Sequence, residues 1–410
     1  MKIVLAHNFY GSEAPSGENH VYLEESRLLR EAGHHILEFT RNSDEIRAAG
    51  YWGMIRGGLS TPWNPFAAVK LRQLIKREQP DVLHVHNVFP LLSPAILHAA
   101  AGLPTAIVLT LHNYRLFCAA GIPMRDNQVC TRCLDEHSVL PALRYGCYRG
   151  SRTATVPLAA MISLHRRLGT WHRTVDAFIA LTPFQRDTMV GAGLPKSLVK
   201  LKPHFYRNPP SPVMWSARDH QVVYVGRLGA EKGVEFLIRA WQLWGEGAPR
   251  LDLIGDGPER GALEEMVRAS GQGRYVSFRG QLSFSETQRH ISRARLLVIP
   301  SLSFEGFPMV IREAYALGVP VAGSRLGSIP GIVVDGKTGR LFRPGDALDL
   351  YRTLRELWDA PLLLEQMGKR ARTEFEARYT AERNHATLME IYQSALRVRH
   401  ARLHGGSMHQ

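Results

Sequence analysis

Short apolar segments alternate with helix-like segments along most of this chain, and this alternation restricts the possible folds more than any other feature. In the first half the strand-like segments are residues 2–7, 34–40, 81–87, 104–112 and 177–182. The helix-like segments are residues 18–32, 65–79, 91–102, 155–172 and 183–193. Strands that alternate with helices of this length form parallel βαβ units. The first half is therefore predicted to be an α/β domain with a parallel sheet.

A proline-rich segment without periodicity, residues 203–219, divides the chain. A second α/β series follows it, with strand-like segments at 221–227, 250–257, 276–280, 295–301 and 319–324. We expect an N-terminal domain at 1–205 with a cysteine-rich insertion at about 113–150, a C-terminal domain at 206–379, and a helix at 380–410 that crosses back to the first domain. Two such doubly wound domains are expected to face each other across a cleft. Ligands bind outside the carboxyl ends of the strands in open parallel sheets.

The composition is that of a soluble globular protein with an excess of positive charge. The 410 residues are 45% hydrophobic and 21% charged, and 51 Lys and Arg against 37 Asp and Glu give a formal net charge of +14. This length suits two domains. The charge favours an anionic partner, although it also serves solubility. The apolar run at the N-terminus is too short for a signal peptide, and no run approaches the ~18 apolar residues of a membrane span. A cytoplasmic protein is therefore expected.

Four cysteines, and no others, lie close together in the sequence: Cys118, Cys130, Cys133 and Cys147. Disulfides are uncommon in a reducing cytoplasm. A C-x2-C pair flanked by one more cysteine on each side suits tetrahedral zinc with four thiolate ligands. Buried cysteines without a metal are the alternative. We expect a structural zinc site.

Two cations bracket a glycine-containing loop directly after a strand-like segment. The segment VGRLGAEKG, residues 225–233, contains Arg227 and Lys232. Cations at the end of a strand, next to glycines that allow a close backbone approach, suit a diphosphate group. Surface loops often carry such residues without a ligand, so this loop alone is weak support.

The segment FEGFPMVIREA, residues 304–314, places a carboxylate on the apolar side of a helix. Pro308 suits the first position of that helix, and at about 100° per residue Glu313 falls on a stripe with Val310, Ala314 and Leu317. A carboxylate near an apolar surface needs a partner. A ribose offers two hydroxyl donors, whereas a salt bridge to a neighbouring arginine is the structural alternative. Free N–H groups at the start of the helix would attract a phosphate.

These segments, together with DGKTGRLFRPGD at 335–346, resemble the retaining GT-B glycosyltransferases of family 4 in identity and order. The resemblance spans nearly the whole chain and is strongest from 221 to 350. It implies that Arg227 and Lys232 hold the donor diphosphate, that Glu313 binds the ribose, and that Glu305 lies by the hydroxyls of the donor sugar. The remaining implied contacts are the backbone of Gly306, Phe307 and Pro308, the side chain of His112 on the transferred sugar, and Gly17 near the donor phosphate and acceptor.

The chain departs from the family pattern at three places. The N-terminal loop has one glycine, in PSGEN, where the family has a pair; HFYRNPP replaces an Asn-Gly segment before the linker; and Gly331 follows GSIP, where a glutamate is frequent. The single glycine in PSGEN affects what can be inferred about the acceptor. The other two departures affect what can be inferred about the exact substrate, and they do not involve the expected donor-binding residues.

The resemblance implies transfer of a hexose from a nucleotide sugar to an acceptor hydroxyl with retention and without a catalytic cofactor. The acceptor would be a glycan or lipid-linked, and bacterial surface polysaccharide synthesis is the implied setting, with UDP and GDP sugars equally open. One alternative is a catalytically silent nucleotide-sugar-binding regulatory protein of the same fold. A nicotinamide-dependent enzyme is disfavoured because no G-x-G-x-x-G follows the first strand. A nucleic-acid binder is disfavoured because no known module appears.

One further segment, residues 157–175, predicts an amphipathic helix with Leu158, Met161, Leu164 and Leu168 on one side and several arginines around it. Such a helix suits an anionic membrane surface, which would place the protein on the inner face of the membrane. Packing of its apolar side into the first domain is the ordinary alternative.

Overall fold

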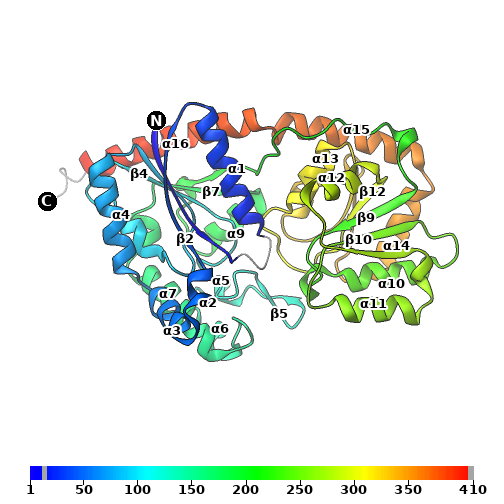
Figure 1. The fold of residues 1–410 in the computed structure, drawn as a ribbon, viewed down its shortest axis with the longest axis horizontal. Coiled ribbons are helices and arrows are strands. Elements are labelled where there is room, and N and C mark those ends of the chain that lie inside the picture. Colours follow the sequence, from blue (N-terminus) through cyan, green and yellow to red (C-terminus); the bar gives the residue numbers. More distant parts are fainter. Residues whose placement is uncertain (12–15, 405–410) are drawn as a thin grey trace. The chain divides into compact units, whose positions relative to one another are not determined.

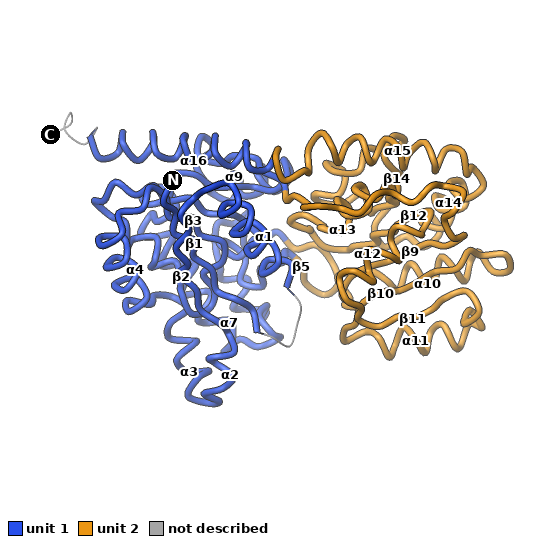
Figure 2. Tube along the Cα trace, turned by 45° about the horizontal axis from the view of Figure 1, so that its top comes forward, with its two compact units in different colours: residues 1–123, 131–203, 384–410 blue, residues 124–130, 204–383 orange. Residues whose placement is uncertain are grey.

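The computed structural model describes residues 1–11 and 16–404. The chain divides into two compact units (Figures 1 and 2). Unit 1 contains residues 1–123, 131–203 and 384–410, and unit 2 contains residues 124–130 and 204–383. The sequence analysis placed the corresponding divisions at 205/206 and 379/380.

Unit 1 is built on a six-stranded parallel sheet with the strand order β2-β1-β3-β4-β7-β8. Its strands are β1 (Lys2–Phe9), β2 (His35–Asn42), β3 (Val82–Asn87), β4 (Ala106–Thr110), β7 (Ala177–Ala180) and β8 (Val199–Leu201). The sequence predicted the first five, and it missed β8, which has only three residues. The cysteine-bearing region also contains two antiparallel strands of two residues each, β5 (Met124–Arg125) and β6 (Gln128–Val129), which belong to unit 2.

The helices of unit 1 are α1 (Gly17–Glu31), α2 (Asp44–Ala48), α3 (Gly50–Ser60), α4 (Pro65–Glu78), α5 (Arg132–Asp135), α6 (Leu140–Tyr145), α7 (Arg152–Arg167), α8 (Thr170–Arg173), α9 (Pro183–Gly191) and, from Asn384 onward, α16 (Ala381–His404). The expected helix at 91–102 is wrong: only a 3-10 turn forms over Pro94–His98. This apolar stretch is almost wholly buried, and short buried runs do not reveal their secondary structure by composition.

The core of unit 1 joins the sheet to the C-terminal helix. Ile3 and Leu5 of β1, Val82 of β3, and Leu388 and Tyr392 of α16 belong to one buried apolar cluster. The last helix therefore belongs to the first unit by packing, although its sequence follows the second. This arrangement explains why the C-terminal segment has an apolar side of its own.

Unit 2 contains a second six-stranded parallel sheet with the order β11-β10-β9-β12-β13-β14. Its strands are β9 (Gln221–Val225), β10 (Arg250–Ile254), β11 (Val276–Gly280), β12 (Leu296–Ile299), β13 (Val321–Ser324) and β14 (Gly339–Phe342). Its helices are α10 (Val234–Trp244), α11 (Arg260–Ala269), α12 (Phe284–Arg293), α13 (Met309–Ala316), α14 (Ala347–Trp358) and α15 (Pro361–Arg378). The strand order reverses between β9 and β12, and this is where a doubly wound sheet binds its ligand.

Candidate functional site

The loops that follow β9 and β12 meet because a glycine lets them approach. Gly233 has φ of +67°, and a Cβ on it would lie 2.1 Å from the carbonyl oxygen of Pro300. A side chain there would collide with the backbone after β12. The glycine that closes the VGRLGAEKG loop thus brings Lys232 next to residues 300–305, at the point where the strand order reverses.

Lys232 and Glu305 form an ion pair at this point. The Lys232 Nζ lies 2.7 Å from Glu305 Oε1, and the Ser301 hydroxyl donates to the same oxygen at 2.8 Å. The Ser328 hydroxyl donates to the Glu305 carbonyl at 2.8 Å and holds the backbone. Burial opposes ionisation of Glu305, but the Lys232 ammonium and the Ser301 hydroxyl outweigh it and hold the pKa of this carboxyl below its usual value. The ionised carboxylate of Glu305 and the ammonium of Lys232 therefore lie next to each other.

Arg227 is the more exposed of the two predicted cations. Its side chain is 57% exposed, and its guanidinium contacts Glu231 Oε1 at 2.6 Å. The buried Tyr224 hydroxyl donates to the Arg227 carbonyl at 2.9 Å, which fixes the backbone while the side chain stays at the surface. Arg227 could therefore exchange Glu231 for a phosphate oxygen without disturbing the core.

Glu313 is buried on the apolar side of its helix, as its spacing predicted. It is 7% exposed, and the Gln288 amide of α12 donates to its Oε2 at 3.0 Å. The nearest arginine contact, Arg312 Nη2 to Glu313 Oε1, is 3.9 Å long. The neutral amide is thus the close partner, and the expected alternative of a salt bridge occurs only as a distant contact. Gln288 was not identified from the sequence, because nothing local relates it to a residue 25 positions away.

The segment before α13 differs slightly from the expected helix start. Pro308 is the N-cap residue and Met309 the first helical residue. The Phe307 ring is buried and contacts the rings of His204 and Tyr379, at centroid distances of 5.5 and 5.8 Å. Phe307 therefore fixes this loop through its side chain, and only its backbone and that of Gly306 can serve a ligand.

In unit 1, His112 follows β4 and lies against a second histidine. Its Nε2 is 3.1 Å from Nδ1 of His86, and the two rings stack at 5.3 Å. Gly17 is the first residue of α1, with Ser16 as N-cap. Residues 12–15 of the predicted N-terminal loop lie outside the described residues.

Glu18 is a site residue that the sequence analysis missed. It follows Gly17, and the amide of Asn113, the neighbour of His112, donates to its Oε1 at 2.8 Å. Burial raises the pKa of the Glu18 carboxyl. Asn113 directly follows His112, and Glu18 directly follows Gly17. These two neighbouring positions were the only hint in the sequence that Asn113 and Glu18 belong to the same site.

Three of the four cysteines expected to bind zinc, Cys118, Cys133 and Cys147, belong to unit 1, and Cys130 belongs to the short segment 124–130 of unit 2. The Cys118 thiol donates to the Ile122 carbonyl, and burial raises its pKa to about 11. Cys133 and Cys147 pack with an apolar cluster. Zinc at the four cysteines stays a prediction that metal analysis of the purified protein can test.

The amphipathic helix at 157–175 corresponds to α7 and α8, and its apolar side faces the protein. Leu158, Met161 and Ile162 are about 2% exposed or less, and they pack with Phe89 and Val139. The core thus covers the first part of this side, as the ordinary alternative expected, whereas Leu164 is partly buried and Leu168 is 39% exposed. Little of this side is therefore left for a membrane contact. Among the described residues no helix is long and apolar enough to cross a membrane.

Comparisons with known proteins match both units. A family model described as Glycosyltransferase Family 4 matches residues 15–206, and one described as Glycosyl transferases group 1 matches residues 219–360. N-acetyl-alpha-D-glucosaminyl L-malate synthase of Bacillus anthracis is 24% identical over 338 residues, which cover 82% of this chain and 80% of that protein. Sulfoquinovosyl transferase of Arabidopsis thaliana is 37% identical over 158 residues, which cover 38% of this chain and 30% of that protein.

Among solved structures, Anabaena HepE in complex with UDP-glucose superposes with a TM-score of 0.65 and 17% identity, and the match covers 96% of this chain and 100% of that one. At this identity the likeness shows the fold. The matched part is less than a third of the Arabidopsis protein but most of the Bacillus and Anabaena proteins.

Proposed function

We propose, on the premise that this chain belongs to the family 4, group 1 glycosyltransferases and has the GT-B fold, that it transfers a hexose from a nucleotide sugar to a hydroxyl group with retention. The observation that carries the proposal is the Lys232–Glu305 pair, which stands at the strand-order reversal of unit 2. The related proteins act on varied substrates by their names. A glycan or lipid-linked acceptor in bacterial surface polysaccharide synthesis is the setting we propose.

Each donor residue has a role that its position permits. Lys232 and Arg227 would contact the diphosphate, and the N–H groups at the start of α13 would donate hydrogen bonds to a phosphate oxygen. Glu313 would accept hydrogen bonds from the ribose hydroxyls in place of, or beside, the one from Gln288. Glu305, kept ionised by Lys232, would accept from hydroxyls of the sugar.

The reaction needs no protein nucleophile in this scheme. The bond between the anomeric carbon and the diphosphate oxygen breaks while the acceptor oxygen bonds to the same face of that carbon. The acceptor proton passes to the leaving phosphate oxygen. Lys232 and the start of α13 stabilise the negative charge that develops on the diphosphate, and this electrostatic contribution is the largest one expected from the protein.

A panel of radiolabelled nucleotide sugars, with mixed glycan and lipid-linked acceptors, tests the proposal. Transfer of label from one donor is the expected result, and the anomeric configuration of the product decides whether the reaction retains. Binding of a nucleotide sugar without any transfer would instead support the silent regulatory protein, the second candidate function. The intact Lys232–Glu305 pair favours the enzyme, since a protein that only binds needs no group that stabilises a leaving diphosphate.

Replacing Glu313 with alanine should weaken donor binding by about tenfold to a hundredfold, because a buried hydrogen bond to a charged group contributes roughly 1.5–3 kcal/mol. Calorimetric titration of the nucleotide sugar measures the change. Glu313→Gln is the matched control, since it keeps the side-chain shape and an acceptor for Gln288 but lacks the charge, and it should bind more tightly than Glu313→Ala. Equal donor affinity in wild type and Glu313→Ala would exclude the ribose role.

The membrane association that we propose for this protein uses α3 in place of α7. Tyr51, Trp52, Met54 and Leu59 on α3 are each more than 60% exposed. The buried side of α3 consists of glycine residues, Gly53 and Gly57. A Cβ on Gly57 would lie 2.8 Å from the Ile46 side chain, so this side has no room for a larger residue. Large apolar side chains thus face outward where a soluble helix would turn them inward.

The charge around this helix suits an anionic lipid surface. Residues 46–77 contain six Lys or Arg and no Asp or Glu, and residues 137–175 contain six Arg and no Asp or Glu. The two segments adjoin, since α3 lies against α7 where Gly58 approaches Pro157. Basic residues near a membrane each contribute about 1 kcal/mol, and apolar aromatic side chains anchor at the interface.

Sedimentation with vesicles tests this surface. The protein should bind phosphatidylglycerol vesicles at low salt, bind phosphatidylcholine vesicles weakly, and dissociate as salt rises. Trp52→Ser/Leu59→Ser should lower the affinity at least about tenfold, because two apolar side chains no longer enter the interface. Leu362→Ser in unit 2, equally exposed at 74%, is the control and should bind like wild type. No binding to anionic vesicles at low salt would contradict the proposal.

A further inference from the structure

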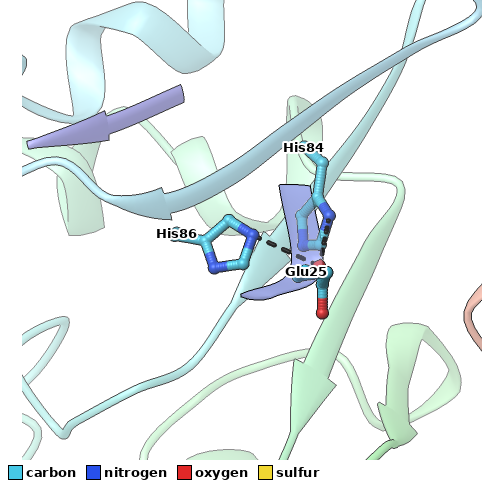
Figure 3. Close-up of side chains that lie close together, drawn as sticks. All are labelled: Glu25, His84 and His86. Carbon is cyan, nitrogen blue, oxygen red and sulfur yellow. Dashed lines mark ion pairs between the residues drawn. The ribbon is translucent and has the colours of Figure 1, made fainter. Parts of the chain in front are cut away.

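A buried cluster of charged and polar side chains lies directly behind His112 in unit 1. His84 and His86 alternate on β3, so both point to the same face of the sheet, and Glu25 of α1 meets them there (Figure 3). Glu25 Oε1 is 3.2 Å from His84 Nδ1 and 3.3 Å from His86 Nε2. All three side chains are at most 3% exposed.

Lys202, the residue after β8, completes the cluster. Its Nζ is 2.6 Å from Glu25 Oε2 and donates to Asn384 Oδ1 at 3.2 Å. Burial opposes ionisation of Glu25, but Lys202 and the two histidines outweigh it and keep the pKa of this carboxyl well below its usual value. Glu25 is therefore a carboxylate, which can only accept hydrogen bonds.

The same three residues are close enough together to suggest a metal site, and Glu25 Oε1 and His86 Nε2 have no hydrogen bond of good geometry among the described residues, but the neighbouring groups disfavour a cation. The Lys202 ammonium occupies one oxygen of Glu25. His84 contacts the Tyr392 hydroxyl through Nδ1 at 2.7 Å and the Thr110 hydroxyl through Nε2 at 2.8 Å. A divalent cation would meet the buried ammonium as a like charge, so the cluster is better suited to ordering protons than to binding a metal.

The carboxylate determines where the proton of His86 lies. Glu25 Oε1 lies 3.3 Å from His86 Nε2 without hydrogen-bond geometry, and a carboxylate at this distance repels a lone pair and attracts an N–H group, so the neutral form of His86 favours a proton on Nε2 and a lone pair on Nδ1. His86 Nδ1 in turn faces His112 Nε2 at 3.1 Å. Only a proton on His112 Nε2 makes that contact a hydrogen bond.

We propose that Glu25, held by Lys202, is a positioning residue that acts through His86 to keep the proton of His112 on Nε2. The lone pair of His112 then lies on Nδ1, an arrangement that can accept a hydrogen bond from a hydroxyl group. This assignment rests on the proposed function for the contact between His112 and the sugar, but the proton arrangement itself does not.

Nitrogen chemical shifts of the histidine rings test the arrangement without any activity. In protein labelled with 15N-histidine, His86 and His112 should both appear as Nε2–H tautomers, with their signals assigned by loss in His86→Asn and His112→Asn. Removing the charge pair together, in Glu25→Leu/Lys202→Leu, should change the His86 and His112 signals and leave those of His165 unchanged. An Nδ1–H tautomer at His112 in wild type, or unchanged His86 and His112 signals in the double variant, would overturn the proposal.

Kinetics test the consequence for catalysis. His86→Leu should lower kcat by about tenfold to a hundredfold with little change in donor KM, because a misplaced catalytic group costs rate more than binding. His86→Asn, whose amide oxygen can replace Nδ1, should lose less. His34→Leu is the matched control, since His34 also contacts a histidine, His385 at 3.2 Å, and is not itself a member of this cluster.

The outcomes separate the two proposals. Expected tautomers with no sugar transfer by wild type from any donor would leave the proton arrangement standing and remove the proposed function. Transfer by wild type with equal kcat in His86→Leu, His86→Asn and His34→Leu would overturn the positioning role and leave the proposed function intact.

Discussion

Replacing Lys232 with alanine should lower kcat by about a hundredfold to a thousandfold, the range found when one preorganised donor to a developing charge is removed. Lys232 is the cation that the glycine loop brings to the strand-order reversal, where Glu305 and Ser301 hold it. The ammonium would gain interaction energy as the diphosphate leaves. Donor affinity should therefore fall less than kcat, and steady-state kinetics with calorimetric donor binding measures both.

The control must account for the charge that the substitution leaves behind. Without Lys232, the mostly buried carboxylate of Glu305 would keep the Ser301 hydroxyl and the more distant charge of Arg227 but lose its ion pair. Lys232→Ala/Glu305→Gln removes both charges and separates the loss of the ammonium from the orphaned carboxylate. Arg227→Ala should have a smaller effect, because Arg227 is largely exposed. A loss in Arg268→Ala, on an unrelated surface pair in α11, equal to that in Lys232→Ala would show that the effect is not specific.

Local patterns predicted much of the candidate site in unit 2. The strands β9 and β12, the loops that follow them and the burial of Glu313 all follow from periodicity and from glycines at fixed positions. Each of these signals is contained in one short segment of the sequence, 225–233 or 304–314. The parallel sheet then brings the ends of β9 and β12 together. Gly233 is the clearest case, since the loop requires its positive φ and leaves no room for a side chain.

The features that sequence reasoning missed depend on distant contacts. Gln288 meets Glu313 across two helices, and Glu25, His86 and Lys202 come together from α1, β3 and the end of β8. No regular spacing in the sequence indicates that these residues come together. The α7 helix shows the opposite problem: its amphipathic pattern is real, but a pattern shows only that one face is apolar and does not show what covers it.

Replacing Lys202 with methionine should lower the free energy of unfolding of unit 1 by about 3–5 kcal/mol near neutral pH, because it leaves the buried Glu25 carboxylate without its cation. Lys202→Met/Glu25→Leu should recover most of that loss, since apolar residues of similar volume replace a buried pair at little cost. Hydrogen exchange of the β3 and β8 amides measures the stability of this unit alone. Equal protection in wild type and Lys202→Met would show that the pair adds nothing.

The free energy of unfolding of unit 1 should change with pH in opposite directions in wild type and in Lys202→Met. In wild type the pKa of Glu25 is lowered on folding, so its contribution is present above the ordinary carboxyl pKa and is lost as pH falls through the folded value. In Lys202→Met, burial without the ammonium should raise the pKa of Glu25, opposed only by the facing His84 and His86. The carboxyl then takes up a proton on folding, and the stability of that variant should fall as pH rises through the raised pKa. Exchange measured at several pH values distinguishes a charged pair from mere packing, because a packing defect would lower stability equally at each pH.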